Sequence, residues 1–325
     1  DAAKNGVTHL AVEASSHGLD QYRLDGLKLQ AAGFTNLTHE HLDYHGTLEN
    51  YRIAKSRLFD EVLPEGNLAV LNADSTEYET FKEISENRGH EIVSYGYKGA
   101  DLKIIERFPQ PKGQDVRLSL FGMEVDLSIP LVGEFQLMNV LCAMGLAMAG
   151  IENGRERIED IWGVLSKIQP VRGRLELVSG HPQGAAIYVD YAHTPDALET
   201  VLNACKPHVN NRLVCVVGCG GDRDKTKRSV MGKIATELAD IVIVTDDNPR
   251  REDPATIRKE ILKEAPDALE IAPRGKAIRE AVKMLETGDV LLIAGKGHEQ
   301  GQIIGDETHH FDDVEEAQKA IGELS

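Results

Sequence analysis

The sequence has few cysteines, few aromatic residues and no long hydrophobic run. Its four cysteines include no CxxC pair and each lies in an apolar segment, which indicates reduced thiols in the core of a cytosolic protein. The longest apolar runs are far too short to cross a bilayer, and we expect no cleavable leader. The sequence therefore predicts a cytoplasmic protein that does not bind membranes.

The sequence also lacks an excess of basic residues. It carries 36 lysines and arginines against 53 aspartates and glutamates, a formal net charge of -17. No basic face is evident to collect phosphates, which argues against a general nucleic-acid binder. An anionic ligand would have to be held by a few specifically placed arginines and lysines.

What the sequence does have is an alternation of strand-like and helix-like segments. This alternation is typical of an α/β protein with largely parallel sheets, and residues 7–14 (VTHLAVEA) are expected to form an early strand. Residues 91–129 break the rhythm with short alternating runs, and Phe121-Gly122 between the last two runs predicts an antiparallel hairpin. A long helix is expected over about 134–149.

The length of 325 residues suits roughly two domains. Pro170 and Gly173 separate two periodic regions, so we predict a first domain over residues 1–170 and a second over 171–325. In the second domain the alternation restarts and predicts a doubly wound, Rossmann-like fold. Ligands of such sheets bind in the crevice outside the carboxyl ends of the strands.

Four loops that follow predicted strands of the second domain are rich in charged residues and glycine. They are VDYAHTPDAL (189–198), GCGGDRDKTKR (218–228), TDDNPRRED (245–253) and AGKGHEQG (294–301). Taken singly, each is ordinarily a structural cap or turn, but their convergence on one sheet edge favours a binding site. The second loop imitates a phosphate loop, yet Asp224 precedes its Lys225-Thr226 pair and would repel a phosphate, so we reject that interpretation.

The DNPR stretch has a composition that suits an amino-acid ligand. Pro249 stiffens the turn and Arg250 can offer its planar fork of donors to a carboxylate. The two acids and the amide of residues 246–248 can meet an ammonium, and Glu299 adds a further carboxylate from another loop.

The first domain has its own acidic and histidine-rich loops, AVEASSHG (11–18) and TNLTHEHLDYHG (35–46). Carboxylate, imidazole and hydroxyl groups at adjacent strand ends can bind a divalent ion. Magnesium takes oxygen ligands and water, whereas zinc is the weaker alternative because HxHxxxH spacing in a loop matches no standard zinc site.

Together these residues resemble the Mur ligases, and within them the branch that adds meso-diaminopimelate. The resemblance covers almost the whole chain and lies in long blocks in the family's order: EASSHGLDQYRLDG, TNLTHEHLDYHGTLENYRIAKSRLF, VDYAHTPDAL, GGDRDKTKR, DDNPRRED and AGKGHE. It implies the middle ATPase domain of that family followed by its carboxyl-terminal domain.

The resemblance implies roles for four groups of residues. For magnesium and catalysis it implies Glu13, His41 and Lys55, the last as a carbamate that turns a cation into an oxygen ligand. For the muramoyl dipeptide it implies Ser15, Gln21 and Arg23. For ATP it implies Asn139, Arg174, Asp190 and His193. For the incoming amino acid it implies Arg223, Asp247, Asn248, Pro249, Arg250, Gly295 and Glu299.

The activity implied is an ATP-dependent amide ligation that joins meso-diaminopimelate to UDP-N-acetylmuramoyl-L-alanyl-D-glutamate through an acyl phosphate. ATP and Mg²⁺ are the expected cofactors, and a monomer is expected. Two alternatives stay open. One is an amide ligase of the same superfamily with another amino acid, of the lysine-adding or folylpolyglutamate type, and the other is a non-catalytic amino-acid-binding remnant.

The sequence also departs from the family. It contains no GxxGK(S/T) phosphate loop and no amino-terminal uridine-binding domain, and it starts abruptly, so we expect a fragment that is inactive alone. Glu40, Gln136 and Arg172 stand where the family commonly has Asp, Asn and Pro.

Overall fold

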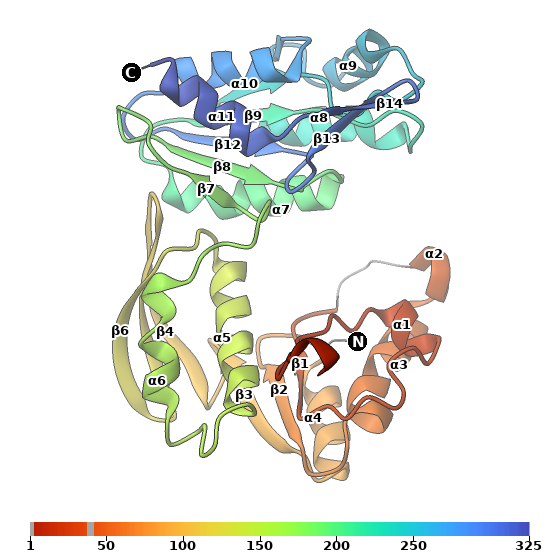
Figure 1. Cartoon of the computed structure of the whole chain (residues 1–325), viewed down its shortest axis with the longest axis vertical. Helices are drawn as coiled ribbons and strands as arrows, with labels where there is room; N and C mark the ends of the chain where they lie inside the picture. The colour runs from red at the N-terminus through yellow and green to blue at the C-terminus, as the bar shows by residue number, and fades with distance from the viewer. Residues whose placement is uncertain (1–2, 38–41, 325) are drawn as a thin grey trace. The chain divides into compact units, whose positions relative to one another are not determined.

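The computed structural model describes residues 3–37 and 42–324. Their contacts divide into two compact units, each treated separately below (Figure 1). The first unit comprises Asp1–Arg107, Val116–Ser128 and Phe135–Ser166, and the second comprises Phe108–Asp115, Ile129–Glu134 and Lys167–Ser325.

The first sheet has six strands that lie side by side in chain order. They are β1 (Ala31–Phe34), β2 (Leu68–Asn72), β3 (Glu91–Gly96), β4 (Leu102–Gln110), β5 (Gly113–Leu120) and β6 (Met123–Ile129). Strands β1 to β4 pair in parallel. Phe121 and Gly122, which join the neighbours β5 and β6, both have positive φ (51° and 86°), as a two-residue hairpin turn requires. The predicted hairpin is confirmed.

Helical segments accompany this sheet, and some of them pack against it around a small aromatic core. They are η1 (Ala3–Asn5), α1 (Ser16–Asp20), α2 (Leu42–His45), α3 (Leu48–Arg57), the π-helix η2 (Leu58–Val62), α4 (Tyr78–Asn87), α5 (Glu134–Met148), α6 (Ile158–Trp162) and the 3-10 helix η3 (Leu165–Lys167). The rings of Phe34 and Phe81 stack with centroids 4.0 Å apart. Thr47 begins α3 by accepting a hydrogen bond from the Asn50 N–H. The helix predicted over 134–149 is confirmed by α5.

The early strand predicted for residues 7–14 is wrong. These residues are irregular, and Leu10 is 70% exposed. A parallel strand is stabilised by hydrogen bonds to a neighbour and by burial of its apolar side chains. Segment 7–14 pairs with no strand in the part of the chain that the structure describes, where β1 has β2 as its neighbour. The apolar pattern alone therefore does not specify a strand here.

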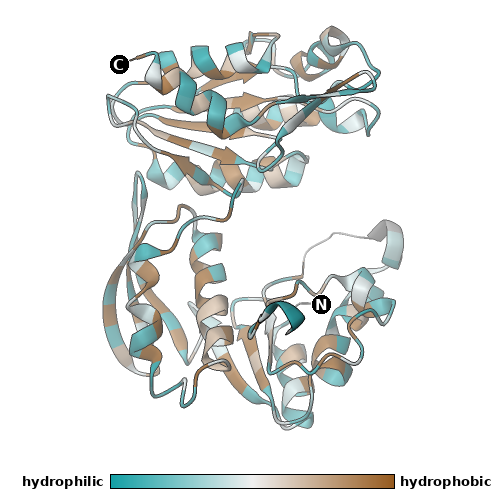
Figure 2. Cartoon of the chain, in the orientation of Figure 1, coloured by the Kyte–Doolittle hydropathy of each residue, from teal (hydrophilic) through white to brown (hydrophobic). Residues whose placement is uncertain are grey.

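The second sheet has the order β11-β10-β9-β12-β8-β7. Its strands are β7 (Glu176–Val178), β8 (Ala186–Asp190), β9 (Leu213–Val217), β10 (Ile241–Val244), β11 (Leu269–Glu270) and β12 (Val290–Ala294). All pairs are parallel except β7 with β8. Every residue of β8, β9 and β12 is buried, which explains their continuous apolar runs (Figure 2). The predicted α/β class, with mostly parallel sheets and a Rossmann-like second unit, is confirmed.

Helices cover both faces of this sheet. They are α7 (Pro195–Cys205), η4 (Lys206–His208), α8 (Thr226–Leu238), α9 (Pro254–Leu262), α10 (Arg274–Lys283) and α11 (Asp313–Gly322). Figure 1 shows α10 and α11 on one face and α7 on the other. All four cysteines are buried and free, as predicted. No described helix combines the length and apolar character that crossing a bilayer requires.

A hairpin that the sequence did not reveal follows β12. Strands β13 (Gly301–Ile304) and β14 (Glu307–His310) pair antiparallel. The backbone of Arg250 forms a bridge with Ile304, since the Arg250 N–H donates to the Ile303 carbonyl and the Gly305 N–H donates to the Arg250 carbonyl. The hairpin is thereby fixed to the loop that follows β10.

Candidate functional site

The four charged loops of the second unit meet at the carboxyl edge of its sheet. Strand β12 lies between β8 and β9, so the order in which strands are added to the sheet reverses there, and ligands of such sheets bind outside the carboxyl ends of the strands at this point. The Gly295 N–H donates to the Asp190 carbonyl at 3.0 Å, and the Gly221 N–H donates to the Asn248 carbonyl at 2.9 Å. These bonds join the loops in pairs and hold them in one place.

Two of the predicted arginines lie together at Gly220. The Arg250 Nη1 atom donates to the Gly221 carbonyl at 2.9 Å. A Cβ atom on Gly220 would lie 2.7 Å from that Nη1, so glycine makes room for the Arg250 side chain, and Cγ of Arg223 lies 3.9 Å from the same position. The other side-chain N–H groups of Arg250 make no hydrogen bond to residues 3–37 or 42–324. They remain available to a ligand carboxylate.

Two carboxylates belong to the same edge. The Asp247 Oδ1 atom accepts from the Asn248 N–H at 2.6 Å, while Oδ2 lies 2.8 Å from the position that a Cβ atom on Gly295 would occupy. Gly295, with φ of +121°, therefore lets the Asp247 carboxylate lie against the backbone. The Glu299 side chain is 34% exposed. Asp247 and Glu299 can both attract an ammonium group.

The side chains of Asn248 and Asp246, both expected to meet a ligand ammonium, also make hydrogen bonds within the protein. The Asn248 side chain donates to Glu299 Oε2 at 2.9 Å and accepts from Lys296 Nζ and the Ile303 N–H, each at 3.0 Å. The Asp246 carboxylate accepts from Arg258. Their polar atoms are engaged by the protein itself, whereas the composition of the loop showed only that they were polar.

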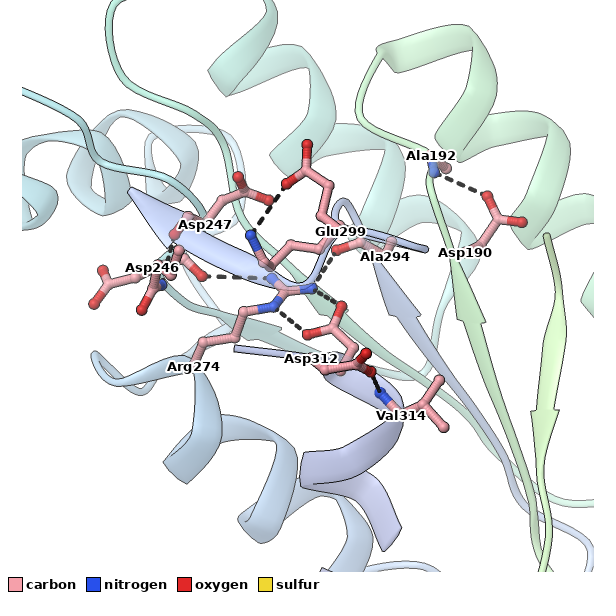
Figure 3. Close-up of polar contacts among 12 residues, drawn as sticks. Asp190, Ala192, Asp246, Asp247, Arg274, Ala294, Glu299, Asp312 and Val314 are labelled. Carbon is pink, nitrogen blue, oxygen red and sulfur yellow. Dashed lines mark hydrogen bonds and ion pairs between the residues drawn. The ribbon is translucent and has the colours of Figure 1, made fainter. Parts of the chain in front are cut away.

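Behind these loops lies a buried arginine that the sequence did not single out. The Arg274 guanidinium is fully buried, donates twice to Asp313 at 2.7 Å, and donates to the Ala294 carbonyl at 2.9 Å and the Asp246 carbonyl at 3.4 Å (Figure 3). It thus joins the ends of β10 and β12 to the first turn of α11. No motif marks such a residue, because its partner lies 39 positions away.

The residues predicted to contact ATP gather around Tyr191, apart from Asn139. The Asp190 carboxylate accepts from the N–H groups of Leu175 and Ala192, both at 2.8 Å, and burial raises its pKa while these N–H groups oppose the shift. Asp190 therefore fixes the loop (Figure 3). Around the Tyr191 ring lie Arg174 at 5.1 Å, His193 at 4.5 Å and His298, which was not predicted, at 5.1 Å.

Asn139 lies in the first unit, on α5. Its side-chain amide donates to Gln136 Oε1 at 3.3 Å. Gln136, which stands where the family commonly has Asn, is thus its hydrogen-bond partner.

In the first unit, the structure brings Lys55 to the loop that carries Glu13 and Ser15. Lys55 Nζ donates to the Ala14 carbonyl at 3.2 Å, and Ser15 caps α1 by accepting from the Gly18 N–H at 3.1 Å. His41 lies outside the described residues. Among those described, no three His, Cys, Asp or Glu side chains form a cluster that could hold a metal ion. An unmodified lysine cannot ligate one either, so a magnesium site here depends on the carbamate.

Gln21 and Arg23 are also brought together. Arg23 donates to the Gln21 Oε1 atom, and Gln21 Nε2 donates to the Tyr44 hydroxyl at 3.0 Å. Tyr44 in turn donates to Asp20 at 2.9 Å. This group connects α1 with α2 and leaves the two predicted residues exposed.

Several residues with left-handed backbone lie beside the predicted site residues. Among the described non-glycine residues with positive φ, Tyr22 lies between Gln21 and Arg23, Leu175 follows Arg174, Asp222 precedes Arg223, and Arg250 is itself one. Such conformations cost free energy and gather where function requires a particular geometry. They support the choice of these loops on grounds independent of charge.

A cavity of about 540 Å³ in the first unit lies elsewhere. It is lined by Leu68 and Glu91, the first residues of β2 and β3, and by residues 153–156 after α5. It therefore opens at the amino ends of the strands, and ligands of parallel sheets bind at the carboxyl ends.

Glu252 connects two loops of the site and should make the stability of the second unit depend on pH. Its carboxylate accepts from Arg228 at 2.9 Å, pairs with Lys225 at 3.0 Å and accepts from the Asp222 N–H at 2.7 Å. These donors, Arg228 above all, lower the pKa of Glu252 from 4.5 to about 2. A carboxyl whose pKa is lower in the folded state stabilises the fold above its unfolded pKa, and this stabilisation disappears as the pH falls from about 4.5 to about 2.

We therefore expect Glu252→Gln to lower the melting temperature near neutral pH and to weaken its dependence on pH over that acid range. Thermal melts followed by circular dichroism at several pH values measure both. If the melting temperature falls with pH equally steeply in the variant and in the unaltered chain over that range, Glu252 is not the cause of the pH dependence.

Charged loops that gather at the carboxyl edge of a parallel sheet define a ligand-binding α/β protein, and comparison with known sequences identifies its family. Residues 1–147 match the Mur ligase middle domain, and residues 173–297 match the Mur ligase, glutamate ligase domain. The chain belongs to the Mur ligase family.

Several curated relatives carry one name, UDP-N-acetylmuramoyl-L-alanyl-D-glutamate--2,6-diaminopimelate ligase. The protein of that name from Caulobacter vibrioides is 52% identical over 319 residues, and that from Agrobacterium fabrum is 49% identical over 326. These matches cover 98% and 100% of this chain, but the chain spans only 65% of the length of each relative.

Solved structures agree in fold. A structure of a ligase with the same name is 36% identical, has a TM-score of 0.71 and covers 99% of this chain and 66% of its own. A MurF ligase from Thermotoga maritima, solved in complex with ADP, is 17% identical with a TM-score of 0.61 and covers 92% of this chain and 64% of its own. At that identity the second structure shows a shared fold alone.

Proposed function

We propose that this chain is the catalytic part of an ATP-dependent amide ligase that joins meso-diaminopimelate to UDP-N-acetylmuramoyl-L-alanyl-D-glutamate, a step in peptidoglycan precursor synthesis. The observation that carries the proposal is the pairing of opposite charges at one sheet edge. Arg223 and Arg250 meet at Gly220, and the carboxylates of Asp247 and Glu299 lie in loops joined to theirs. The names of the relatives point to the same amino acid.

The amino-acid site suits a ligand with two zwitterionic ends. The free N–H groups of Arg250 would bind the carboxylate of the far end, with Arg223 beside it. Asp247 and Glu299 would bind an ammonium, while Pro249 and Gly295 shape the backbone around them. Lysine has a side-chain amine but no second carboxylate, so Arg250 would lose its partner and lysine should bind more weakly.

The nucleotide and the muramoyl dipeptide would bind through the other groups. Arg174 and His193 would contact ATP, with Asp190 holding their loop, and Asn139 is a further candidate contact to ATP. Ser15, Gln21 and Arg23 would bind the dipeptide. We take residues 1–170 and 171–325 as the two domains, in a cytoplasmic monomer that binds neither nucleic acid nor membranes.

Magnesium would be held by Glu13, His41 and the carbamate of Lys55, and it would offset the charge that ATP and the substrate carboxylate bring together. The γ-phosphoryl group passes from ATP to the D-glutamyl carboxylate, which gives an acyl phosphate and ADP. The amine of diaminopimelate attacks the acyl carbon, loses a proton and displaces phosphate, so that an amide forms. Arg250, Asp247 and Glu299 serve this step by orienting the amine.

Titration calorimetry of the 325-residue chain tests the amino-acid part of the proposal. We expect meso-diaminopimelate to bind about tenfold or more tightly than L-lysine, because an unpaired charged group in the site costs roughly 1–3 kcal/mol. Equal affinities would favour a ligase that uses another amino acid. If neither amino acid binds, the proposed amino-acid site is wrong. With the upstream region restored, binding without ADP release would favour a non-catalytic remnant.

A further inference from the structure

Lys296 lies between loops of the proposed amino-acid site, although it has no assigned role there. It is 0% exposed. Its ammonium donates to the Asn248 Oδ1 atom at 3.0 Å, to Glu299 Oε2 at 3.1 Å and to the Gly301 carbonyl at 2.6 Å. An ammonium has three donors, and here each has an acceptor. The three acceptors come from the loop after β10, the loop after β12 and the start of β13.

This arrangement fixes one oxygen of Glu299 and leaves the other available. Oε2 accepts hydrogen bonds from both Lys296 Nζ and the Asn248 side-chain amide. Oε1 accepts no hydrogen bond from the described part of the chain, and the side chain is 34% exposed. The carboxylate is therefore held by its inner oxygen and presents its outer oxygen to the solvent side of the site.

Lys296 also balances the local charge. Asp247 and Glu299 are both acidic, and both act electrostatically on the buried Arg274 behind them. Arg274 is already paired with Asp313. Without Lys296 the charge of Glu299 would lack its buried partner, and a carboxylate without a partner is free to turn away or to repel Asp247.

We propose that Lys296 is a positioning residue of the amino-acid site, which locks Glu299 and the β13–β14 hairpin in the geometry that binds the ligand ammonium. The inference rests on the proposed function, because it concerns the same ligand. It adds a residue that acts through Glu299 and Asn248 without contacting the substrate. The backbone on both sides of Lys296 is closely packed, since a Cβ atom on Gly297 would lie 2.7 Å from Cβ of Tyr191 and one on Gly295 would lie 2.8 Å from Asp247 Oδ2.

A double-mutant cycle on the 325-residue chain tests the proposal, with meso-diaminopimelate affinity measured by calorimetry. We expect Lys296→Met to weaken binding about tenfold or more, as expected when a charged partner is removed from a partly buried carboxylate. In a chain that already carries Glu299→Gln, the same change should have little further effect, because the group that Lys296 positions is gone. A purely structural lysine would give equal losses in both backgrounds.

Arg212→Met is the matched control for lost stability. Arg212 pairs with the buried Asp289 at 2.6 Å, so its loss also leaves a buried carboxylate without its partner. It precedes β9, at the amino edge of the sheet away from the loops of the site. We expect this variant to melt at a lower temperature and to keep its affinity for meso-diaminopimelate within about twofold.

If Lys296→Met does not fold, Lys296→Gln carries the test, since its amide is polar enough for the buried site but supplies neither the charge nor the three donors that hold Glu299, Asn248 and Gly301. A measurement on the unaltered chain needs no variant. With ¹⁵N-labelled lysine, the slowly exchanging signal of a buried ammonium should shift when meso-diaminopimelate is added.

The outcomes separate the two proposals. Failure of the unaltered chain to bind meso-diaminopimelate would overturn the amino-acid site and the role of Lys296 with it. If the unaltered chain binds meso-diaminopimelate, three results would each overturn the role of Lys296 alone. They are unchanged affinity in the Lys296 variants, equal losses with and without Glu299→Gln, and an ammonium signal that does not shift at saturation.

Discussion

Replacing Arg250 by alanine is expected to weaken the binding of meso-diaminopimelate about a hundredfold or more, while ATP affinity stays within about twofold. The Arg250 guanidinium lies over Gly220, where it donates once to the Gly221 carbonyl and keeps its other donors for a ligand. Hydrogen bonds to a charged group contribute roughly 1.5–3 kcal/mol each, so the loss of a two-pronged contact to a carboxylate exceeds a factor of one hundred.

The neighbouring arginine provides the control. Arg251 is 73% exposed and pairs at 2.6 Å with Asp306, which is 79% exposed. Such surface pairs contribute roughly 0–1 kcal/mol, and we expect Arg251→Ala to leave both affinities unchanged. Calorimetric titration of each variant with meso-diaminopimelate and with ATP measures the difference. Equal losses for the two ligands, or the same loss in Arg251→Ala, would mean that Arg250 supports the fold and does not select the amino acid.

A conservative variant separates charge from shape. Arg250→Lys keeps the positive charge but replaces a planar fork of donors by a single ammonium. We expect it to recover part of the affinity lost in Arg250→Ala and to remain well below the unaltered chain. Full recovery would show that a point charge suffices at this position.

The sequence predicted where the charged loops of the second unit lie, for a physical reason. Continuous apolar runs such as β9 and β12 are buried on both faces, and the loops after them must lie at the carboxyl edge of a parallel sheet. Charge and glycine in those loops then indicate a site. Arg223 and Arg250 are brought together as this reasoning requires.

The sequence could not show which atoms of each polar residue are available to a ligand. Asn248 is predicted to contact a ligand, and its amide also makes hydrogen bonds with Lys296, Glu299 and Ile303, which lie about fifty positions away. Whether a side chain binds a ligand or its own protein depends on such distant contacts. The same limit applies to residues 7–14, whose pattern favours a strand but which have no strand to pair with among the described residues.

The other large effect is expected on stability, from Arg274→Met. Arg274 and Asp313 are both 0% exposed and form two hydrogen bonds of 2.7 Å. Removing one partner of a buried ion pair leaves the other charge without compensation and costs about 3–5 kcal/mol. For a unit of this size that corresponds to a fall in melting temperature of roughly 6–20 °C.

The double variant Arg274→Met, Asp313→Leu separates two causes of lost stability: the unpaired charge of Asp313 and the loss of the other contacts of Arg274. Because it removes both charges, it should recover much of the stability that Arg274→Met loses. The recovery should be incomplete, since the Ala294 and Asp246 carbonyls also lose their donor. Chemical denaturation of the three chains measures these differences. A double variant as unstable as the single one would assign the role of Arg274 to those two carbonyls, and hence to holding the ends of β10 and β12 together beneath the site.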